Sequence, residues 1–273
     1  MTELVPTPDR RSPSLSRASY LLLSLLLATI ALIGIVWWPL LAEAVSTFNP
    51  NYPWWWQVDW LLLGIFAVMT SLIVVGADLR RDAAIAAIGL MGGLVIESWG
   101  TQTALWTYYT FERPPLWILP AWPVASLAID RLTTLTQRAT DRLGERATAL
   151  AYLLAFGTFS ALMLPFVWHT RHASLTIAAL VLCAFLIATP VQPRTALATF
   201  IAGVALGYFL ELWGTTRQCW TYYTLQTPPV FAVLAHGMAA VAFWRTGLVL
   251  NMLRLTLGVR RRFGADPDSA RIG

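Results

Sequence analysis

Lysine is absent from this chain of 273 residues, and cysteine and histidine are scarce. All nineteen basic residues are arginine, so no side chain can form a lysine Schiff base, which excludes a retinal-type pigment site. Cys183 and Cys219 do not form a zinc pattern, and the three histidines do not cluster as in a di-iron site. We therefore expect neither a metal nor a cofactor.

Charge is also scarce: 12% of the residues are charged and 57% are hydrophobic, with a mean hydropathy of +0.61. These values are typical of a polytopic membrane protein and not of a soluble domain. The formal net charge of +5 would suggest an anionic partner in a soluble protein. Here the arginines fall in loops and tails, where membrane topology explains them, so we expect no nucleic-acid partner.

The apolar runs predict an all-α fold with eight transmembrane helices. The predicted spans are 19–42, 58–77, 83–106, 115–129, 148–168, 173–190, 194–216 and 229–245. Arginine-rich segments and arginine-poor loops alternate across these spans. This alternation predicts a multi-pass protein of the inner (plasma) membrane with both termini in the cytoplasm.

One stretch of this sequence occurs twice, at a constant offset of 114 residues. The first copy reads ESWGTQTALWTYYTFERPP from Glu97, and the second reads ELWGTTRQCWTYYTLQTPP from Glu211. Eleven of the nineteen positions are identical, among them Trp, Tyr and Glu, which rarely coincide by chance, so we interpret the two copies as an internal duplication.

The same offset relates the second predicted span to the sixth, which indicates two parallel repeats of four spans each. The expected organisation is a tail (1–18), a first repeat (19–129), a cytoplasmic linker or short helix (130–147), a second repeat (148–245) and a basic tail (246–273). For the start of that last tail, a membrane-surface helix and a simple extension of span eight are both open.

Two glycines precede each repeated glutamate at four-residue spacing. Gly89 and Gly93 precede Glu97, and Gly203 and Gly207 precede Glu211. On a helix these positions share one face, where glycine lets a second helix approach closely. An acid on that face is costly within a membrane, which favours a function over packing alone.

Each glutamate lies about fifteen residues, or roughly 22 Å, into a span that starts at the cytoplasm, so it should lie in the outer half of the bilayer. A neutral carboxyl can donate a proton and an ionised one can accept it. We therefore predict Glu97 and Glu211 as catalytic residues. The aromatic and polar residues around them are predicted to bind the substrate: Trp99, Thr101, Tyr108, Tyr109, Trp213, Thr215, Arg217, Tyr222, Tyr223 and His236.

The two copies differ at positions that bear on chemistry. Arg217 replaces Thr103 and His236 replaces Trp122. Arg217 could hold Glu211 ionised or bind an anionic headgroup, the alternative being a surface arginine of the outer loop. His236 could relay a proton, the alternative being a histidine satisfied by packing.

The run from Glu97 and Gly100 to Tyr109-Thr110, with the proline-rich segment from Pro115 to Trp122, resembles the carotenoid-biosynthesis membrane proteins that include bisanhydrobacterioruberin hydratase. In that family a Glu-x-x-Gly signature precedes a Tyr-x-Tyr-Thr segment, whereas the tyrosines here are adjacent. The resemblance covers about 30 residues of the first half. It implies hydration, or another acid/base reaction, at an isoprenoid double bond, with Glu97 as proton donor and Glu211 as its internal equivalent.

Three functions are consistent with these observations. The first is a membrane enzyme that binds and modifies a lipid-soluble isoprenoid or carotenoid, its partner being a membrane lipid or polyene. The second is a non-catalytic lipid- or pigment-binding subunit of a membrane complex, and the third is a proton-coupled transporter. A homo-oligomer and a complex with other membrane proteins both remain open.

Overall fold

The computed structural model describes residues 16–188 and 191–263. The predicted tail 1–18 and the end of the predicted tail 246–273 therefore lie largely outside the described residues. In chain order the elements are α1 (Arg17–Val36), α2 (Trp38–Ser46), η1 (Trp54–Trp56), α3 (Trp60–Val74), α4 (Leu79–Gln102), β1 (Trp106–Tyr108), η2 (Leu116–Ile118), α5 (Ala121–Thr140), α6 (Glu145–Val167), η3 (Trp168–Thr170), α7 (Ser174–Ile187), α8 (Pro193–Thr216), β2 (Trp220–Tyr222) and α9 (Val230–Phe263).

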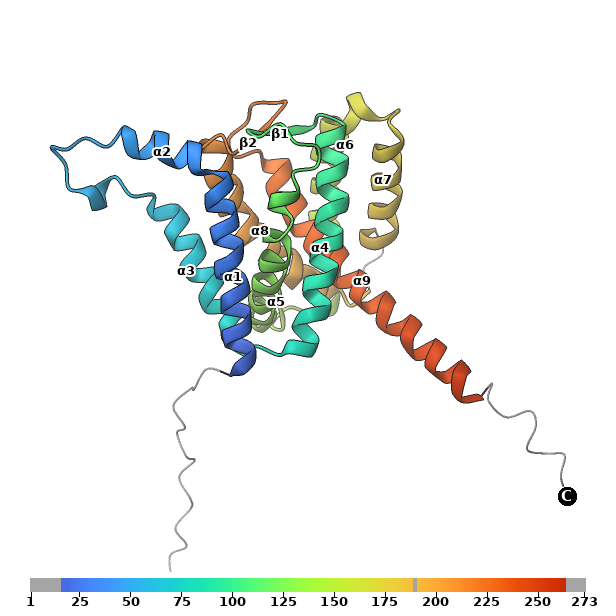
Figure 1. The fold of residues 1–273 in the computed structure, drawn as a ribbon. Coiled ribbons are helices and arrows are strands. Elements are labelled where there is room, and N and C mark those ends of the chain that lie inside the picture. The colour runs from blue at the N-terminus through green and yellow to red at the C-terminus, as the bar shows by residue number, and fades with distance from the viewer. Residues whose placement is uncertain (1–15, 189–190, 264–273) are drawn as a thin grey trace, which may run out of the picture.

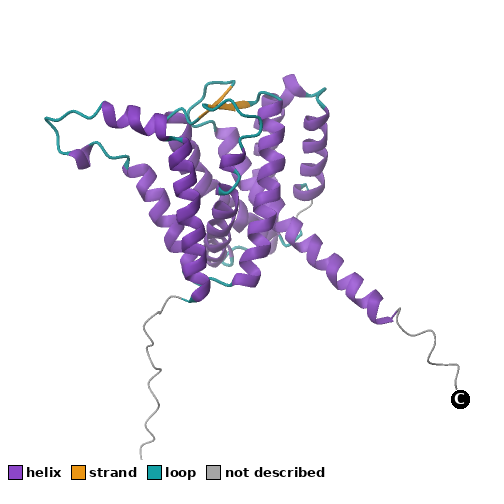
Figure 2. Ribbon diagram, in the orientation of Figure 1, coloured by secondary structure: helices purple, strands orange, loops and turns teal. Residues whose placement is uncertain are grey.

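The helices form a bundle, and β1 and β2 cross one end of it (Figure 1). The first turn of α1 and the last turn of α9 lie toward the opposite end. Five segments are long and apolar enough to cross a membrane: Arg17–Val36, Leu79–Gln102, Glu145–Thr170, Pro193–Thr216 and Val230–Thr256. The predicted helical fold class is thus confirmed, and these five helices indicate a membrane protein. The prediction of helices alone missed the short β1–β2 pair, which Figure 2 shows in orange.

Several boundaries differ from the predicted spans for local reasons. Span 19–42 breaks at Trp37, because Pro39 lacks an N–H and so fits only the first turn of the new helix α2. Helix α4 begins earlier than residue 83, since the Asp78 side chain accepts hydrogen bonds from the backbone N–H groups of Arg80 and Arg81. At the C-terminal end, α9 continues without a break to Phe263, as a simple extension of the predicted span eight.

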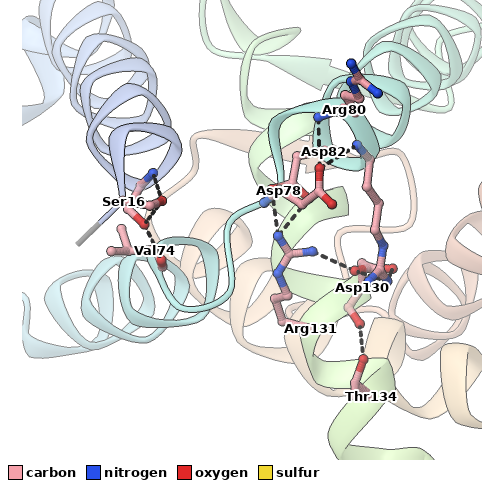
Figure 3. Close-up of polar contacts among 10 residues, drawn as sticks. Ser16, Val74, Asp78, Arg80, Asp82, Asp130, Arg131 and Thr134 are labelled. Carbon is pink, nitrogen blue, oxygen red and sulfur yellow. Dashed lines mark hydrogen bonds and ion pairs between the residues drawn. The ribbon is translucent and has the colours of Figure 1, made fainter. Parts of the chain in front are cut away.

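Helical structure occupies most of the segment 130–147, because α5 continues to Thr140 and α6 begins at Glu145. At the start of this segment an ion-pair network joins α5 to α4 (Figure 3). Arg131 donates to both carboxylate oxygens of Asp82, at 2.7 and 2.8 Å, and the Asp82 side chain is fully buried. Asp130 pairs with both Arg81 and Arg131. Because an unpaired buried charge is strongly destabilising, this network fixes the α4–α5 contact at the end of the bundle away from β1 and β2.

The equivalent elements of the duplication have matching bounds. Helix α8 begins and ends 114 residues after α4, and β2 begins and ends 114 residues after β1. Small residues permit close helix contacts at matching places: a Cβ atom on Gly93 would lie 2.2 Å from the Trp122 ring, and one on Gly207 would lie 2.4 Å from the His236 Cβ atom. These contacts bring α5 against α4 and α9 against α8, beside the two glutamates.

Candidate functional site

The chain reverses direction directly after α4 and again after α8. Ala104 and Gln218 each have a φ of 56°, in the left-handed region. The following backbone N–H donates at 2.9 Å to the carbonyl of Gly100 in the first copy and of Gly214 in the second. A left-handed residue just past the last turn is a common way to end a helix. The motif therefore turns back over the helix that it follows.

Each reversal places an indole ring on a glycine. A Cβ atom on Gly100 would lie 1.8 Å from the Trp106 ring, and one on Gly214 would lie 1.9 Å from the Trp220 ring. No other amino acid leaves space for the ring at this distance. The identity of these glycines in both copies is thus explained by the indole that covers each of them.

The two copies of the motif meet in an antiparallel strand pair. Thr107 pairs with Thr221 at its centre, and the pairs on either side join Trp106 to Tyr222 and Tyr108 to Trp220. The ring centroids of these two aromatic pairs are 5.9 and 6.0 Å apart. Each half thus presents its tryptophan next to the tyrosine of the other half, so the surroundings of the two glutamates are built together.

Glu97 accepts three hydrogen bonds and is 3% exposed. Its Oε1 accepts from the Tyr108 hydroxyl at 2.8 Å and from the Trp122 Nε1–H at 3.2 Å, and its Oε2 accepts from the Trp106 Nε1–H at 3.1 Å. An indole N–H can only donate, so two of these three partners are donors under all conditions.

Glu211 has the same arrangement with one substitution, and is 2% exposed. Its Oε1 bonds the Tyr222 hydroxyl at 2.9 Å and the His236 Nε2 at 3.0 Å, while its Oε2 accepts from the Trp220 Nε1–H at 3.0 Å. His236 therefore occupies the position of Trp122. Its imidazole can donate, accept or carry a proton, which an indole cannot.

The two exchanged side chains lie near each other across the bundle. The rings of Trp122 and His236 are nearly parallel, at 18°, with centroids 6.2 Å apart. Trp122 also packs edge-on against Phe243 at 6.0 Å. The His236 side chain is 21% exposed, whereas that of Glu211 is 3% exposed. His236 is thus the more exposed member of the Glu211–His236 pair, and the Trp122 ring stacks beside it.

Burial raises the pKa of the Tyr108 and Tyr222 hydroxyls well above the ordinary phenol value, and the neighbouring carboxylates raise it further. Both phenols therefore stay protonated and remain available as donors to Glu97 and Glu211.

Other predicted site residues make contacts that do not reach the carboxylates. The hydroxyls of Thr101 and Thr215 donate to the backbone carbonyls of Glu97 and Glu211 within their own helices. The remaining donors reach neighbouring helices instead: Tyr109 donates to the Val36 carbonyl, Tyr223 donates to the Phe166 carbonyl at 2.7 Å, and Trp99 donates to the Thr176 hydroxyl at 3.1 Å. These residues hold the motif against the bundle.

Arg217 does not pair with Glu211, contrary to one of the two predicted roles. Its Nε donates to Asp59 Oδ2 at 2.9 Å, and the Trp213 Nε1–H donates to the same oxygen at 2.9 Å. Asp59 also caps the first turn of α3. A separation of 158 residues hides this contact from any reading of local spacing. The structure thus assigns Arg217 and Trp213 to an anchor that joins the end of α8 to the start of α3.

Three donors to the carboxylates were missing from the predicted site: Trp106, Trp220 and Trp122. Tryptophan is present at this position in both copies, as Trp106 and Trp220, which indicates a functional role. An interpretation as membrane-interface anchors explains the same identity equally well. Trp122 was visible only as the equivalent of His236. Its role depends on the contact between α4 and α5, which no motif spacing gives.

Within residues 16–188 and 191–263, no group of three or more His, Cys, Asp or Glu side chains is placed to hold a metal ion. Comparison of the chain with protein-family models, curated proteins and solved structures finds no match.

Proposed function

We propose that this chain is an integral membrane protein that binds a lipid-soluble isoprenoid or carotenoid and modifies it by acid/base chemistry at the Glu211–His236 pair. One observation carries the proposal. The two carboxylate sites have the same donors except that His236 stands where the first site has Trp122. His236 in the second site can therefore exchange a proton with a ligand, whereas the Trp122 indole in the first site cannot.

The roles of the two glutamates differ accordingly. Although the family resemblance gives the donor role to Glu97, the surroundings favour Glu211 as the partner of the proton-carrying ring. Glu97 takes the positioning role, because its three donors fix Trp106, Tyr108 and Trp122 in place. Trp122 in turn stacks beside His236. Such a division between two carboxyls follows from their different environments.

The proposed reaction is the addition of water to a carbon–carbon double bond. His236 transfers a proton from Nδ1, the ring nitrogen that does not bond Glu211, to one alkene carbon. The oxygen of a water molecule forms a bond with the other carbon, and the surplus proton of that water returns to the Glu211–His236 pair. The product contains one additional water, and nothing is oxidised or reduced.

The class of ligand follows from what surrounds His236. The His236 ring stacks beside Trp122, and Trp122 in turn packs against Phe243. Flat apolar walls with one polar group suit an unsaturated hydrocarbon better than a sugar or a nucleotide.

The proposed architecture is a pair of parallel four-span repeats, with α1, α3, α4 and α5 equivalent to α6, α7, α8 and α9. Both termini would face the cytoplasm of the inner membrane, and β1 and β2 would face outward. The matching bounds of α4 and α8 and the shared glutamate surroundings support this arrangement.

A non-catalytic lipid- or pigment-binding subunit is the second candidate. It is favoured by the burial of both glutamates, which are 3% and 2% exposed and make three hydrogen bonds each. Carboxylates that are fully satisfied can serve to lock the two halves together, because buried polar networks rigidify a core when every member is paired.

The test of binding is extraction of lipids from the purified full-length protein, followed by mass spectrometry. We expect an isoprenoid or polyene that is enriched over the bulk lipid of the same membrane. A protein that carries only the bulk phospholipids would contradict the binding of an isoprenoid or carotenoid.

A further inference from the structure

A polar cavity of about 210 Å³ opens beside β2, in the loop that follows α8. Its walls carry hydroxyl and amide groups, one indole and one aliphatic side chain, with no charged residue. The lining residues are Thr215, Gln218, Trp220, Thr221, Leu225, Gln226 and Thr227. A cavity of this size and polarity has room and hydrogen-bond partners for several water molecules.

The side chain of Trp220 separates the cavity from the Glu211 carboxylate. Trp220 lines it, and the Nε1–H of the same indole donates to Glu211 Oε2 at 3.0 Å. Thr215 also lines it, and its hydroxyl bonds the Glu211 backbone carbonyl. The carboxylate therefore has two different sides: Oε2 faces the cavity wall, and Oε1 faces Tyr222 and His236.

Three of the positions that line the cavity carry different residues in the first copy. Gln218 corresponds to Ala104, and Gln226 and Thr227 correspond to Glu112 and Arg113. The indole also differs, since Trp106 is 8% exposed and buried, whereas Trp220 is partly exposed. In the first copy the indole of Trp106 is thus buried, whereas in the second copy the indole of Trp220 lines a polar cavity.

We propose that this cavity is a water-binding site through which Glu211 exchanges protons with water from the outer side, with Trp220 between the cavity and Oε2. The proposal deepens the proposed function and rests on it for the use of the proton. Cavity water exchanges a proton with Oε2 when the indole moves aside, and Oε1 passes the proton to His236. The exchange sets the protonation of the pair before the reaction, while the hydration itself consumes no net proton. The copy that contains the proton-carrying histidine is then also the copy that is connected to water.

Hydroxyl-radical footprinting of the full-length protein in lipid nanodiscs tests the site without any need for turnover. The radical forms from water, so oxidation follows access to water, and the equivalent Trp106 serves as the internal control. We expect Trp220 to be oxidised faster than Trp106, because the Trp220 side chain is partly exposed and that of Trp106 is buried. Equal rates, or faster oxidation of Trp106, would overturn the proposal.

A variant then tests the cavity itself. Thr221→Phe fills it, and Trp106 in the same protein remains the internal control. Oxidation of Trp220 should fall to the Trp106 level in this variant, while oxidation of Trp106 stays unchanged. Unchanged oxidation of Trp220 in a folded Thr221→Phe variant contradicts the site; if that variant does not fold, the wild-type comparison decides. Water access without any modified isoprenoid would instead refute the proposed function alone.

Discussion

Glu97 and Glu211 differ in the kind of hydrogen-bond partner that surrounds them, although each has three. Glu97 has two indole N–H groups on opposite oxygens, with a phenol beside one of them. Glu211 has one indole, one phenol and one imidazole. Phenol and imidazole groups can accept as well as donate, whereas indole cannot. The two sites should therefore respond differently to the same substitution.

Replacement by glutamine makes this difference measurable. In Glu97→Gln either orientation of the amide sets its NH2 group against an indole N–H, of Trp106 or of Trp122. In Glu211→Gln the amide oxygen can accept from Trp220 while the NH2 group donates to His236. We expect Glu97→Gln to lower the free energy of unfolding by about 1–3 kcal/mol, the cost of an unsatisfied buried group, and Glu211→Gln to lower it by less than about 1 kcal/mol.

Thermal unfolding of the purified variants in one detergent measures this, with the exposed Glu43→Gln in α2 as the neutral control. Equal losses of stability at positions 97 and 211 would show that the partners do not act as described.

At the scale of elements, the helix end and the turn that follows it form one unit. The left-handed residue turns the chain back, and the glycine one turn before it leaves space for the indole. The indole then reaches the glutamate from the turn and not from a separate helix. The glycine is thus needed for the hydrogen bond between the indole and the glutamate, and not for helix packing alone.

Alanine at these glycines tests the unit. Gly100→Ala and Gly214→Ala should displace Trp106 and Trp220 and cost about 1–3 kcal/mol of stability each, as for an overpacked core. In α6, nothing lies within 4 Å of a Cβ atom on Gly157, so Gly157→Ala should be neutral or stabilise by about 0.5–1 kcal/mol. The measurement is the unfolding midpoint of each variant, and a loss at Gly157 equal to that at Gly100 would contradict the steric explanation.

Much of this element structure was accessible from the sequence, and the limits have physical causes. The apolar runs and the duplication located the helices that carry Glu97 and Glu211, because helical periodicity and the glycine spacing are local signals. The donors Trp106, Trp122 and Trp220 could not be assigned, since a reversed chain and a helix–helix contact bring them to the carboxylates. The pairing of Arg217 with Asp59 likewise depends on packing between distant segments.

At the scale of the whole molecule, the start of α1 and the end of α9 lie toward one end of the bundle, and the β1–β2 pair lies at the other end (Figure 1). Together with the distribution of arginine, this arrangement predicts that the strand pair faces outward and the α5–α6 connection faces the cytoplasm.

Single cysteines in a background without Cys183 and Cys219 can test the orientation in intact cells. A membrane-impermeant thiol reagent should label Gln226→Cys from outside, and should label Arg142→Cys only after the cells are permeabilised. Both positions are exposed, so access to the reagent depends on the side of the membrane alone. Labelling of Arg142→Cys in intact cells would reverse the proposed topology.

The most direct measurement exchanges the one chemical difference between the two halves. His236→Trp makes both carboxylate sites alike, and Trp122→His is the matched control, because each variant keeps three hydrogen-bond partners at both glutamates. Mass spectrometry of lipid extracts from cells that express each variant reports the isoprenoid composition. We predict that His236→Trp still binds the isoprenoid but forms no hydrated isoprenoid. Trp122→His should still form the hydrated product. A hydrated product formed by His236→Trp at the level of the unaltered chain would contradict acid/base chemistry at the Glu211–His236 pair.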